Sequence, residues 1–372
     1  MSGLISIYLD VFRFLAAFGV FFSHAGRLPV SQVLPTLHFD HKLVIIFFVI
    51  SGYVIAASAS RPDRTFANYS ADRLARLSSV VIPALFLTCL LDAVGSRLFP
   101  GVYVLVNPHW QSIRFVANLL YCQQLWFFCV VPSSNNPFWS LGYEFWYYVL
   151  FGIFIFARRH RTKVLLLLAV SLVIGPKILL LLPAWAAGAL AFFAGTRFKC
   201  STRIAFLLFV VSAIGTAAAL IDPNHFGADN GQFGKPPWYY SGNFAGDNLF
   251  GFILAAHFFC CSLFSKQLAA NFEPYRIVQF VRWMASHTFS LYLYHVPLLF
   301  FIRAVTKYDP HNPWEVIGAL SATLVIISLL SKVTEEQYPI LRARARRWMT
   351  SLLRKIRSDA TKPDLVSHPQ KS

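Results

Sequence analysis

The sequence predicts an all-α polytopic integral membrane protein, with about ten transmembrane helices and one re-entrant or interfacial segment. Of the 372 residues, 56% are hydrophobic and only 13% are charged, whereas a soluble domain carries about 25% charged residues. Apolar stretches close to the roughly 20 residues that span a bilayer's hydrocarbon recur along the chain. No polar stretch between them is long enough to form a soluble domain with its own core.

Eleven apolar segments account for most of the chain. Two of them meet at Gly175-Pro176, where about 30 apolar residues fit two spans better than one. The segments lie at 4–25, 42–60, 76–95, 112–131, 137–157, 163–176, 177–195, 203–221, 245–264, 284–305 and 315–334.

The positive charge is concentrated in short loops between these segments and in the C-terminal tail. The net charge is +17, and membrane proteins keep Lys and Arg on the cytoplasmic side. We therefore expect no nucleic-acid partner. We expect a membrane domain at 1–340 and a basic cytoplasmic tail at 341–372. The tail would contact anionic lipid of the bilayer. The basic loops lie at 61–76, 158–163, 197–203 and 266–282.

The segment at 112–131 decides the orientation. If it does not cross, every basic loop and both termini fall on the cytoplasmic side, as the positive-inside rule requires. It contains Arg114, Asn118, Gln123 and Gln124, which suit a re-entrant segment buried in protein. We therefore expect a multi-pass protein with ten crossings and cytoplasmic termini.

The loop at 222–246 is then extracytoplasmic. It is rich in Gly, Pro and Asn and carries Trp238, Tyr239 and Tyr240. These aromatic residues are compatible with an interfacial aromatic belt or with a rim that contacts a sugar, and both interpretations stay open.

Neither a disulfide framework nor a metal site is indicated. The six cysteines form no C-x-x-C pair, and Cys in apolar stretches behaves as a small hydrophobic residue. The chain also lacks the GxxxxGK[ST], HExxH and GxSxG patterns. We expect no bound metal or cofactor.

The first apolar segment, which includes YLDVFRFLAAFGVFFSHAG at 8–26, carries charge inside a predicted membrane helix. Arg13 and His24 are eleven residues apart, about three turns, so they share one face and lie about 16 Å apart along the axis. Asp10 precedes Arg13 by three residues and can pair with it. Charges within a span usually mark a site or pathway, although a snorkelling Arg13 and an interfacial His24 also remain possible.

Polar residues occur in other predicted spans as well. Glu144 lies in NPFWSLGYEFWYY, and His295 lies in SHTFSLYLYHVPL. Pro297 follows His295 and frees a backbone carbonyl. Each residue alone could be a satisfied structural group, but with the polar residues of the first span they form a polar core that a mere anchor does not need.

Two arginines precede the third span. Arg73 and Arg76, in ADRLARLSSVVIP, are three residues apart and share a helix face. Guanidinium groups bind phosphate oxygens in a bidentate manner, although a positive-inside flank explains them too. Ser51 and Gly52, in ISGY, are interpreted as residues of close helix packing rather than of chemistry.

In this order, the motifs resemble those of the acyltransferase-3 family, integral-membrane acyltransferases known for O-acetylating bacterial surface polysaccharides. The resemblance runs from about residue 4 to 340. Gly142 and Tyr143 depart from the family's pattern, and the closing TEEQYPILRAR is spaced differently, so Glu335 and Glu336 receive no role. The matching stretches are LDVFRFLAAFGVFFSH at 9–24, FFVISGYVI at 47–55, RLAR at 73–76, FWSLGYEFWYYVLF at 138–151 and FSLYLYHVPL at 289–298.

The resemblance implies a membrane O-acyltransferase of the bacterial inner membrane. It would move an acyl group, most often acetyl, from cytoplasmic acyl-CoA, its co-substrate, to a hydroxyl of a sugar or cell-surface polysaccharide. Arg73 and Arg76 would hold the phosphates of CoA. Arg13 would line the pantetheine path or offset oxyanion charge, and His24 would act as general base.

The remaining residues of the matched motifs would complete this site. Glu144 would be the third catalytic residue, orienting an imidazole or the acceptor, and Asp10 would position Arg13. Whether His24 instead carries the acyl group covalently is left open. The further supporting residues are Trp139, Ser140, Tyr292 and His295.

Three other functions would also place polar residues in membrane spans. A transporter or exporter of a small molecule or glycan predicts internal repeats and paired broken helices, which the sequence does not display. A different type of membrane acyltransferase, with a buried His–Asn pair, would not predict Arg13 and His24 on one helix face. An O-acyltransferase with a small-molecule acceptor remains within the same family.

Overall fold

The computed structural model describes residues 3–27, 30–35, 40–62, 64–104, 106–107, 109–222, 235–268 and 275–360. Within these ranges all regular secondary structure is helical, which confirms the all-α fold class expected from the sequence. The helices are α1 (Gly3–Arg27), α2 (Asp40–Ala59), α3 (Phe66–Leu98), α4 (Gln111–Leu119), α5 (Trp139–Phe156), α6 (His160–Ile174), α7 (Pro176–Leu180), α8 (Leu182–Arg197), α9 (Thr202–Ile221), α10 (Phe244–Leu268), α11 (Tyr275–Ser286), α12 (Thr288–Thr306), α13 (Pro313–Val333) and α14 (Tyr338–Ala360). Short 3-10 turns are η1 (Pro100–Val102), η2 (Asn136–Phe138), η3 (Tyr239–Ser241) and η4 (Glu335–Gln337).

Seven stretches among the described residues are long and apolar enough to cross a membrane. Six coincide with α1, α2, α3, α9, α10 and α12, and the seventh, Pro313–Leu352, begins with α13. All seven overlap crossings predicted from the sequence. The three remaining predicted crossings correspond to α5, α6 and α8, of 18, 15 and 16 residues, which rise only about 22–27 Å. The helices are those of a polytopic membrane protein.

The segment expected to be re-entrant contains no helix long enough to cross. α4 has nine residues, and irregular chain follows it as far as η2. Its polar side chains bind nearby backbone carbonyls. Arg114 donates to Val131 at 2.9 Å, and Asn118 donates to Val130 at 2.8 Å. Irregular backbone within a membrane bundle needs such internal partners, which explains why this segment carries polar residues.

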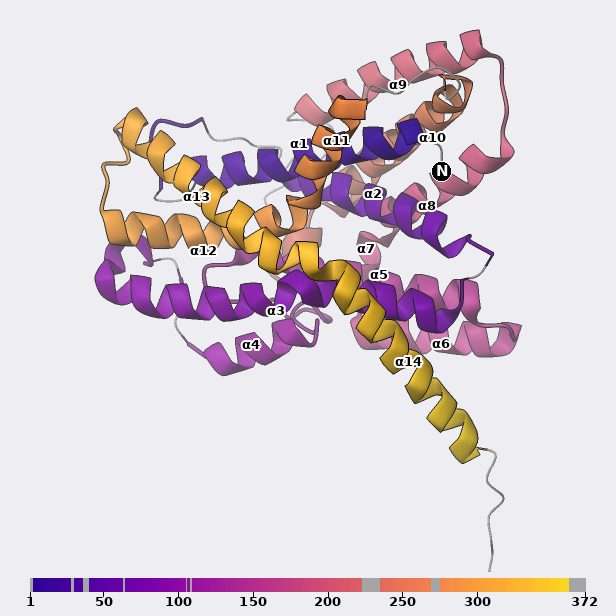
Figure 1. Ribbon diagram of the computed structural model, residues 1–372, viewed down its shortest axis with the longest axis horizontal. Coiled ribbons are helices and arrows are strands. Elements are labelled where there is room, and N and C mark those ends of the chain that lie inside the picture. The colour runs from indigo at the N-terminus through magenta and orange to yellow at the C-terminus, as the bar shows by residue number, and fades with distance from the viewer. Residues whose placement is uncertain are drawn as a thin grey trace, which may run out of the picture.

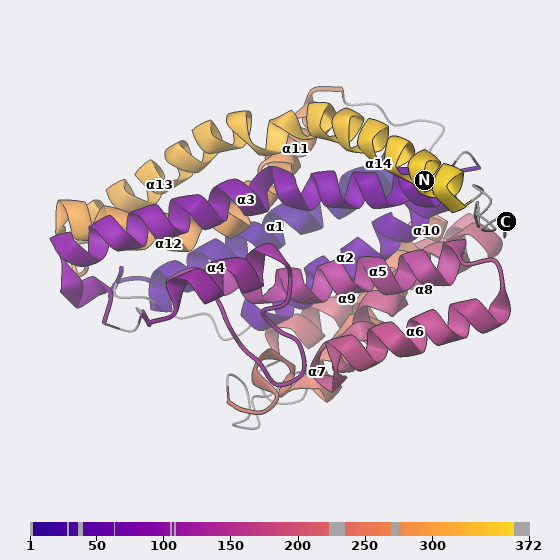
Figure 2. The same ribbon diagram turned by 90° about the horizontal axis from the view of Figure 1, so that it is seen from below.

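The helices pack in two groups. In one group α2 packs against α8, α8 against α10 and α10 against α9; in the other α3 packs against α12 and α14, and α12 against α13. α1 packs against both α2 and α12, and α5 contacts α2 and α3 (Figure 1). Figure 2 shows α13 and α14 curving over one side of the bundle, with α6 at the opposite side. α1 and α5 therefore lie at the junction of the two groups.

Glycines allow α2 and α8 to approach each other closely. A Cβ atom on Gly188 would collide with the carbonyl oxygen of Val49. A Cβ atom on Gly52 would collide with the carbonyl oxygen of Trp185. Small residues let helix backbones approach in this way in membranes, so Gly52 has the packing role that the sequence suggested.

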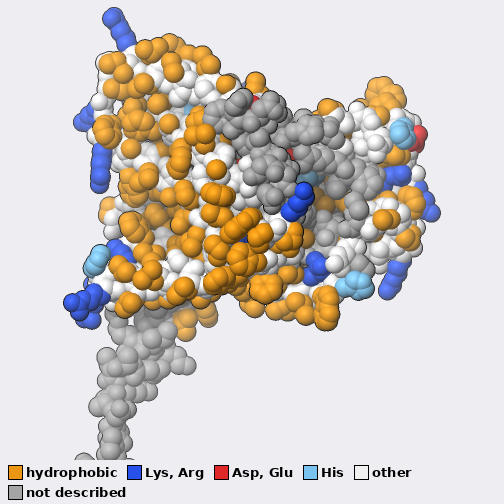
Figure 3. Space-filling view, turned by 180° about the vertical axis from the view of Figure 1, so that it is seen from behind, with side chains coloured by type: hydrophobic (Ala, Val, Ile, Leu, Met, Phe, Trp, Pro, Cys, Tyr) orange, Lys and Arg blue, Asp and Glu red, His pale blue; other side chains and the backbone are white. Residues whose placement is uncertain are grey.

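The outside of the bundle is apolar. Large hydrophobic side chains are exposed on α6, among them Leu165 and Leu172, and on α9, among them Leu207 and Ile214. Figure 3 shows hydrophobic side chains over much of one face, with Lys and Arg mostly near its edges. An exposed apolar surface of this extent is suited to contact with lipid.

The basic chain after Leu341 begins as part of a packed helix. α14 packs against α3, where Asp72 accepts hydrogen bonds from Arg342 at 2.9 Å and from Arg346 at 2.7 and 2.9 Å. Arg64 pairs with the same carboxylate at 2.8 Å. The start of the predicted tail is thus attached to the bundle by ion pairs, and its last residues, 361–372, lie outside the described ranges.

We expect Gly188→Ala to force α2 and α8 apart and to lower the free energy of unfolding by about 1–3 kcal/mol. The matched change Gly215→Ala lies on α9, where an added Cβ meets nothing within 4 Å. The Gly215→Ala change should raise the free energy of unfolding by roughly 0.5–1 kcal/mol, because Ala is the better helix former. Unfolding midpoints of the detergent-solubilised variants measure both effects, and equal midpoints would contradict the close approach.

Candidate active site

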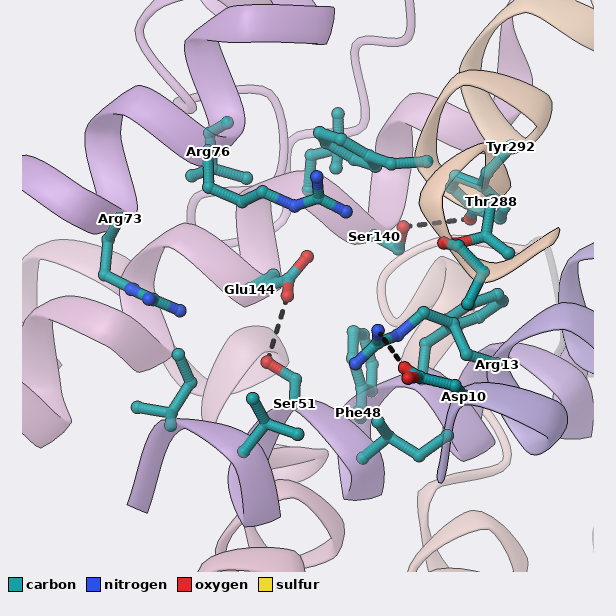
Figure 4. Close-up of a pocket in the computed structure, with 18 of the residues that line it drawn as sticks. Asp10, Arg13, Phe48, Ser51, Arg73, Arg76, Ser140, Glu144, Thr288 and Tyr292 are labelled. Carbon is teal, nitrogen blue, oxygen red and sulfur yellow. Dashed lines mark hydrogen bonds and ion pairs between the residues drawn. The ribbon is translucent and has the colours of Figure 1, made fainter. Parts of the chain in front are cut away.

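The two helix groups enclose a cavity of 410 Å³, within the usual range of about 300–1,000 Å³ for small-molecule sites. Its walls come from α1, α2, α3, α5, α11 and α12, and from Tyr338 at the start of α14. In Figure 4 the side chains of Arg13, Arg76 and Glu144 point into a common space. Helices far apart in the sequence thus form one polar chamber in an apolar bundle.

Seven of the ten predicted site residues line this cavity, and they come from four helices. They are Asp10, Arg13, Arg73, Arg76, Ser140, Glu144 and Tyr292. The other three, His24, His295 and Trp139, lie outside its lining.

The cavity is suited to an anion. Four arginines and two acidic residues line it. Arg13 pairs with Asp10 at 3.1 Å, which confirms the local pairing expected three residues apart on one helix. The fourth arginine, Arg282 of α11, was not singled out from the sequence.

Arg76 is held by a buried carboxylate. Its guanidinium pairs with Glu335 Oε1 at 2.7 Å, and Glu335 Oε2 accepts the backbone N–H of Ser290 at 2.9 Å. Glu335 is only 3% exposed. The contact joins α3, η4 and α12, so Arg76 has a structural role. The sequence left Glu335 without a role because the motif around it is irregularly spaced.

Arg73 is bound differently. Its guanidinium lies 5.8 Å from the ring centre of Tyr148, and its Nε has no hydrogen-bond partner among the described residues. Among the residues that the structure describes, none forms an ion pair with Arg73. Its charge is therefore available to an anionic ligand in the cavity.

Glu144 is fixed by hydroxyl groups. Ser51 donates to Glu144 Oε1 at 2.9 Å, and the Tyr148 hydroxyl donates to the same oxygen. The Trp185 indole N–H donates to Ser51 Oγ at 3.2 Å. Ser51 was expected to serve only helix packing, but its side chain lines the cavity and orients the carboxylate. The hydrogen bonds of Glu144 go to hydroxyl groups and not to an imidazole.

His24 and His295 form a hydrogen-bonded pair of imidazoles. His24 Nδ1 lies 2.8 Å from His295 Nε2, and the rings are nearly parallel at 12°. His295 Nδ1 lies 2.8 Å from the carbonyl oxygen of Leu291. Because a carbonyl can only accept, Nδ1 of His295 carries hydrogen, and in the neutral ring Nε2 accepts. His24 Nδ1 therefore donates, and the lone pair of neutral His24 is on Nε2.

The hydrogen bonding of α12 is interrupted next to this pair. Pro297 has no N–H, so the carbonyl of Leu293 loses its helical donor. Asn135 Nδ2 takes that place at 2.8 Å and also donates to Thr88 Oγ1 at 2.9 Å. Asn135 and His295 are both fully buried. The proline thus interrupts the helix beside His295 without leaving this carbonyl unsatisfied.

Tyr292 connects the cavity with the imidazoles. It lines the cavity, and its ring centre lies 6.4 Å from that of His295. Its hydroxyl lies 2.9 Å from Ser140 Oγ and donates to the Pro137 carbonyl at 3.1 Å. The histidine pair is therefore separated from the cavity by one layer of side chains.

Some residues that line the cavity were not predicted from the sequence. Tyr148 follows Glu144 by four residues, and this spacing could have indicated that the two side chains lie next to each other on one helix face. Arg282 and Tyr338 reach the cavity only through the packing of α11 and α14. Within the described ranges, no group of three or more His, Cys, Asp or Glu side chains could hold a metal ion.

Comparison with protein families agrees with this architecture. The model of the acyltransferase-3 family, described as an acyltransferase domain, matches residues 6–332. Because the match covers most of the chain, the chain belongs to this family of acyl-transferring enzymes, which confirms the resemblance seen in its motifs.

One similar curated protein is named O-acetyl transferase and comes from Shigella phage Sf6. The two share 28% identity over 172 residues, 44% of this chain and 50% of the phage protein. The chain thus matches about half the length of this relative. No solved structure matches the chain.

We expect Arg76→Ala to lower the free energy of unfolding by about 2–3 kcal/mol, because it leaves the carboxylate of Glu335 buried and unpaired. This is less than a fully buried pair would cost, since the Arg76 side chain is 29% exposed. Adding Glu335→Gln should recover part of the loss. Arg73→Ala, which breaks no ion pair, is the matched control and should cost about 1 kcal/mol or less. Equal unfolding midpoints for Arg76→Ala and Arg73→Ala would contradict this assignment.

Proposed function

We propose that this chain is a membrane-bound O-acyltransferase that moves an acyl group, acetyl in the simplest case, from cytoplasmic acyl-CoA to a hydroxyl of a sugar or cell-surface polysaccharide. The observation that carries the proposal lies along α1. An arginine-lined cavity at Arg13 is followed, eleven residues on, by a hydrogen-bonded imidazole at His24. Family membership and similarity to a protein named O-acetyl transferase support it.

The cavity would receive the donor. Arg73 and Arg282 offer guanidinium groups to the phosphates of CoA, and Arg76 adds a charge that it shares with Glu335. The carboxylate of Glu144 is suited to accept hydrogen bonds from the amide groups of the pantetheine arm.

Arg13 would line the path of the pantetheine arm of the donor. It lies about 16 Å from His24 along α1, so the thioester that reaches His24 is beyond its guanidinium. The ion pair with Asp10 at 3.1 Å holds it on the cavity side of α1.

The transfer step would use Nε2 of His24 as the base. This nitrogen takes the proton of the acceptor hydroxyl, whose oxygen forms a bond to the acyl carbon as the carbon–sulfur bond breaks. The proton then passes to the leaving thiolate, and the products are an ester and the free thiol of CoA. The same lone pair can instead carry the acyl group in a two-step route. In both routes His295 sets the tautomer of His24.

We also propose ten crossings in the bacterial inner membrane, with α5, α6 and α8 completing the seven longer spans. Helices this short can cross if the bilayer is locally thin. With both termini in the cytoplasm, Arg73 lies toward the side where acyl-CoA is made available and His24 lies toward the other side. The chain after residue 340 is then a cytoplasmic extension whose first part, α14, is attached to α3.

Label transfer tests the proposed function. Membranes that contain the wild-type protein receive radiolabelled acetyl-CoA, and the envelope polysaccharide is then isolated and counted. His24→Ala should lower the label by at least about 100-fold, the usual minimum for loss of a general base, with membrane abundance unchanged. His257→Ala, at another buried histidine, is the control and should retain transfer. Absence of label with the wild-type protein would contradict the function.

The role of His295 predicts a difference between two substitutions. His295→Gln keeps a carbonyl oxygen that can accept from His24 Nδ1, whereas His295→Leu does not. We expect the leucine variant to lose about tenfold in kcat, the equivalent of one hydrogen bond, and the glutamine variant to lose less. KM for acetyl-CoA should not change in either. Equal losses in both variants would indicate a packing role for His295.

A further inference from the structure

A second cavity lies against a different face of α1 from the arginine-lined one. Its volume is 550 Å³, and its walls come from α1, α2, α9 and α10. Neighbouring residues of α1 line different cavities, since Arg13 lines the first and Phe12 lines the second. No Asp, Glu, Lys or Arg of the described chain lines the second cavity. The two cavities are therefore suited to ligands of opposite chemistry.

The second cavity opens sideways through the surface of the bundle. Leu15 and Phe18 of α1 line it, and they are 58% and 40% exposed. Among the described helices, α9 packs extensively only against α10, and Figure 1 shows it at the edge of the bundle. α1, α9 and α10 are each long and apolar enough to cross a membrane. The opening therefore faces the lipid of the bilayer.

One end of the cavity is closed by aromatic rings whose polar groups already have partners. The hydroxyl of Tyr8 lies 2.5 Å from His257 Nε2, and Ser212 Oγ lies 2.9 Å from His257 Nδ1. The ring centre of Phe209 lies 6.0 Å from that of Tyr8 and 5.5 Å from that of His257. Both imidazole nitrogens are thus engaged within the protein, and this end offers a ligand an apolar wall.

The cavity is elongated along the membrane-spanning helices. Its lining on α1 runs from Tyr8 to Phe22, a separation of fourteen residues, which corresponds to about 21 Å. The hydrocarbon of one bilayer leaflet is about 15 Å thick, half of the roughly 30 Å core. A single hydrocarbon chain that lies parallel to α1 therefore fits the cavity in length. Water is a poor occupant, because apolar cavities stay dry.

One hydroxyl in this apolar lining lacks a partner. Thr216 of α9 is only 6% exposed and lines the cavity. Its Oγ1 has no hydrogen-bond partner among the described residues. A hydroxyl buried in this way is unfavourable unless it is hydrogen-bonded. The carbonyl oxygen of an ester can accept this hydrogen bond, whereas a plain hydrocarbon cannot.

We propose that the second cavity binds one fatty acyl chain of a membrane phospholipid. The chain enters between α1 and α9, lies along α1 and accepts a hydrogen bond from Thr216 Oγ1 through its ester carbonyl. The bound chain fills the space between α9 and the helix that carries Arg13 and His24. The site does not depend on acyl transfer, so failure of label transfer leaves this proposal standing.

Photolabelling tests the proposal. The full-length protein is reconstituted in vesicles of phosphatidylethanolamine and phosphatidylglycerol, with a trace of phosphatidylethanolamine that carries a diazirine on one acyl chain. After irradiation, mass spectrometry locates the attached lipid. We expect adducts at Ala16 and Phe250, which line the cavity and are 1% and 0% exposed. Lipid on the outer surface cannot reach these two residues.

A pair of alanine substitutions on α9 provides a matched comparison. Ala213 is half-buried and lines the cavity, whereas Ala218 is exposed and does not line it. Ala213→Phe places a ring in the cavity and should lower the adducts at Ala16 and Phe250 by about tenfold, because overpacking excludes the chain. Ala218→Phe should leave them within about twofold of the wild type.

Thr216→Val keeps the shape of the side chain and removes its hydroxyl group. It should lower the same adducts by about two- to tenfold, as loss of one hydrogen bond does. This variant also decides the question if Ala213→Phe does not accumulate in membranes. Adducts in Thr216→Val equal to those of the wild type would contradict binding through the ester.

Two other outcomes would overturn the proposal. One is labelling confined to exposed residues such as Leu15, which would mean that no chain enters the cavity. The other is a lipid-linked saccharide, in place of phospholipid, in organic extracts of the purified wild-type protein and its absence from extracts of Ala213→Phe. The cavity would then serve a different lipid.

Discussion

Ions buried between membrane helices need partners, because removing a charge from water costs several kcal/mol even after the protein has relaxed. This constraint explains most of the polar architecture of the bundle. Arg13 is paired within its own helix by Asp10, and Arg76 is paired across helices by Glu335. Arg73 lacks such a partner among the described residues and has only an aromatic ring beside it. An anionic ligand bound in the cavity would supply the negative charge that Arg73 lacks.

The same constraint makes the C-terminal helix part of the site. Asp72 on α3 would be an isolated carboxylate without Arg64 and without Arg342 and Arg346 of α14. By pairing with it, α14 is held where its first residue, Tyr338, closes one wall of the cavity. The basic residues after the last span thus serve the shape of the cavity in addition to any attraction to anionic lipid.

In the proposed mechanism, donor binding and proton transfer take place in different layers of the bundle. The arginines and Glu144 surround a chamber, whereas the imidazoles lie beyond Tyr292, among more fully buried side chains. In this mechanism the charged phosphates of the donor would stay among the arginines, while only its uncharged acyl end would reach the imidazoles. Pro297 and Asn135 together let α12 carry a satisfied but interrupted backbone at the boundary between these layers.

The sequence by itself determined the membrane class, most of the spans, the break at Gly175 and the pairing of Asp10 with Arg13. These features depend on local runs of apolar residues, whose length the bilayer sets, or on spacing within one helix. Only the tertiary structure decided that Glu335 holds Arg76, that α11 and α14 contribute to the cavity, and that His24 pairs with His295. These two pairings join residues 259 and 271 positions apart, and no local pattern encodes them, because they depend on how helix faces pack. The break at Gly175 was predictable because Gly and Pro change the conformation of the backbone at their own positions. A buried ion pair forms only when two helices distant in the sequence pack together.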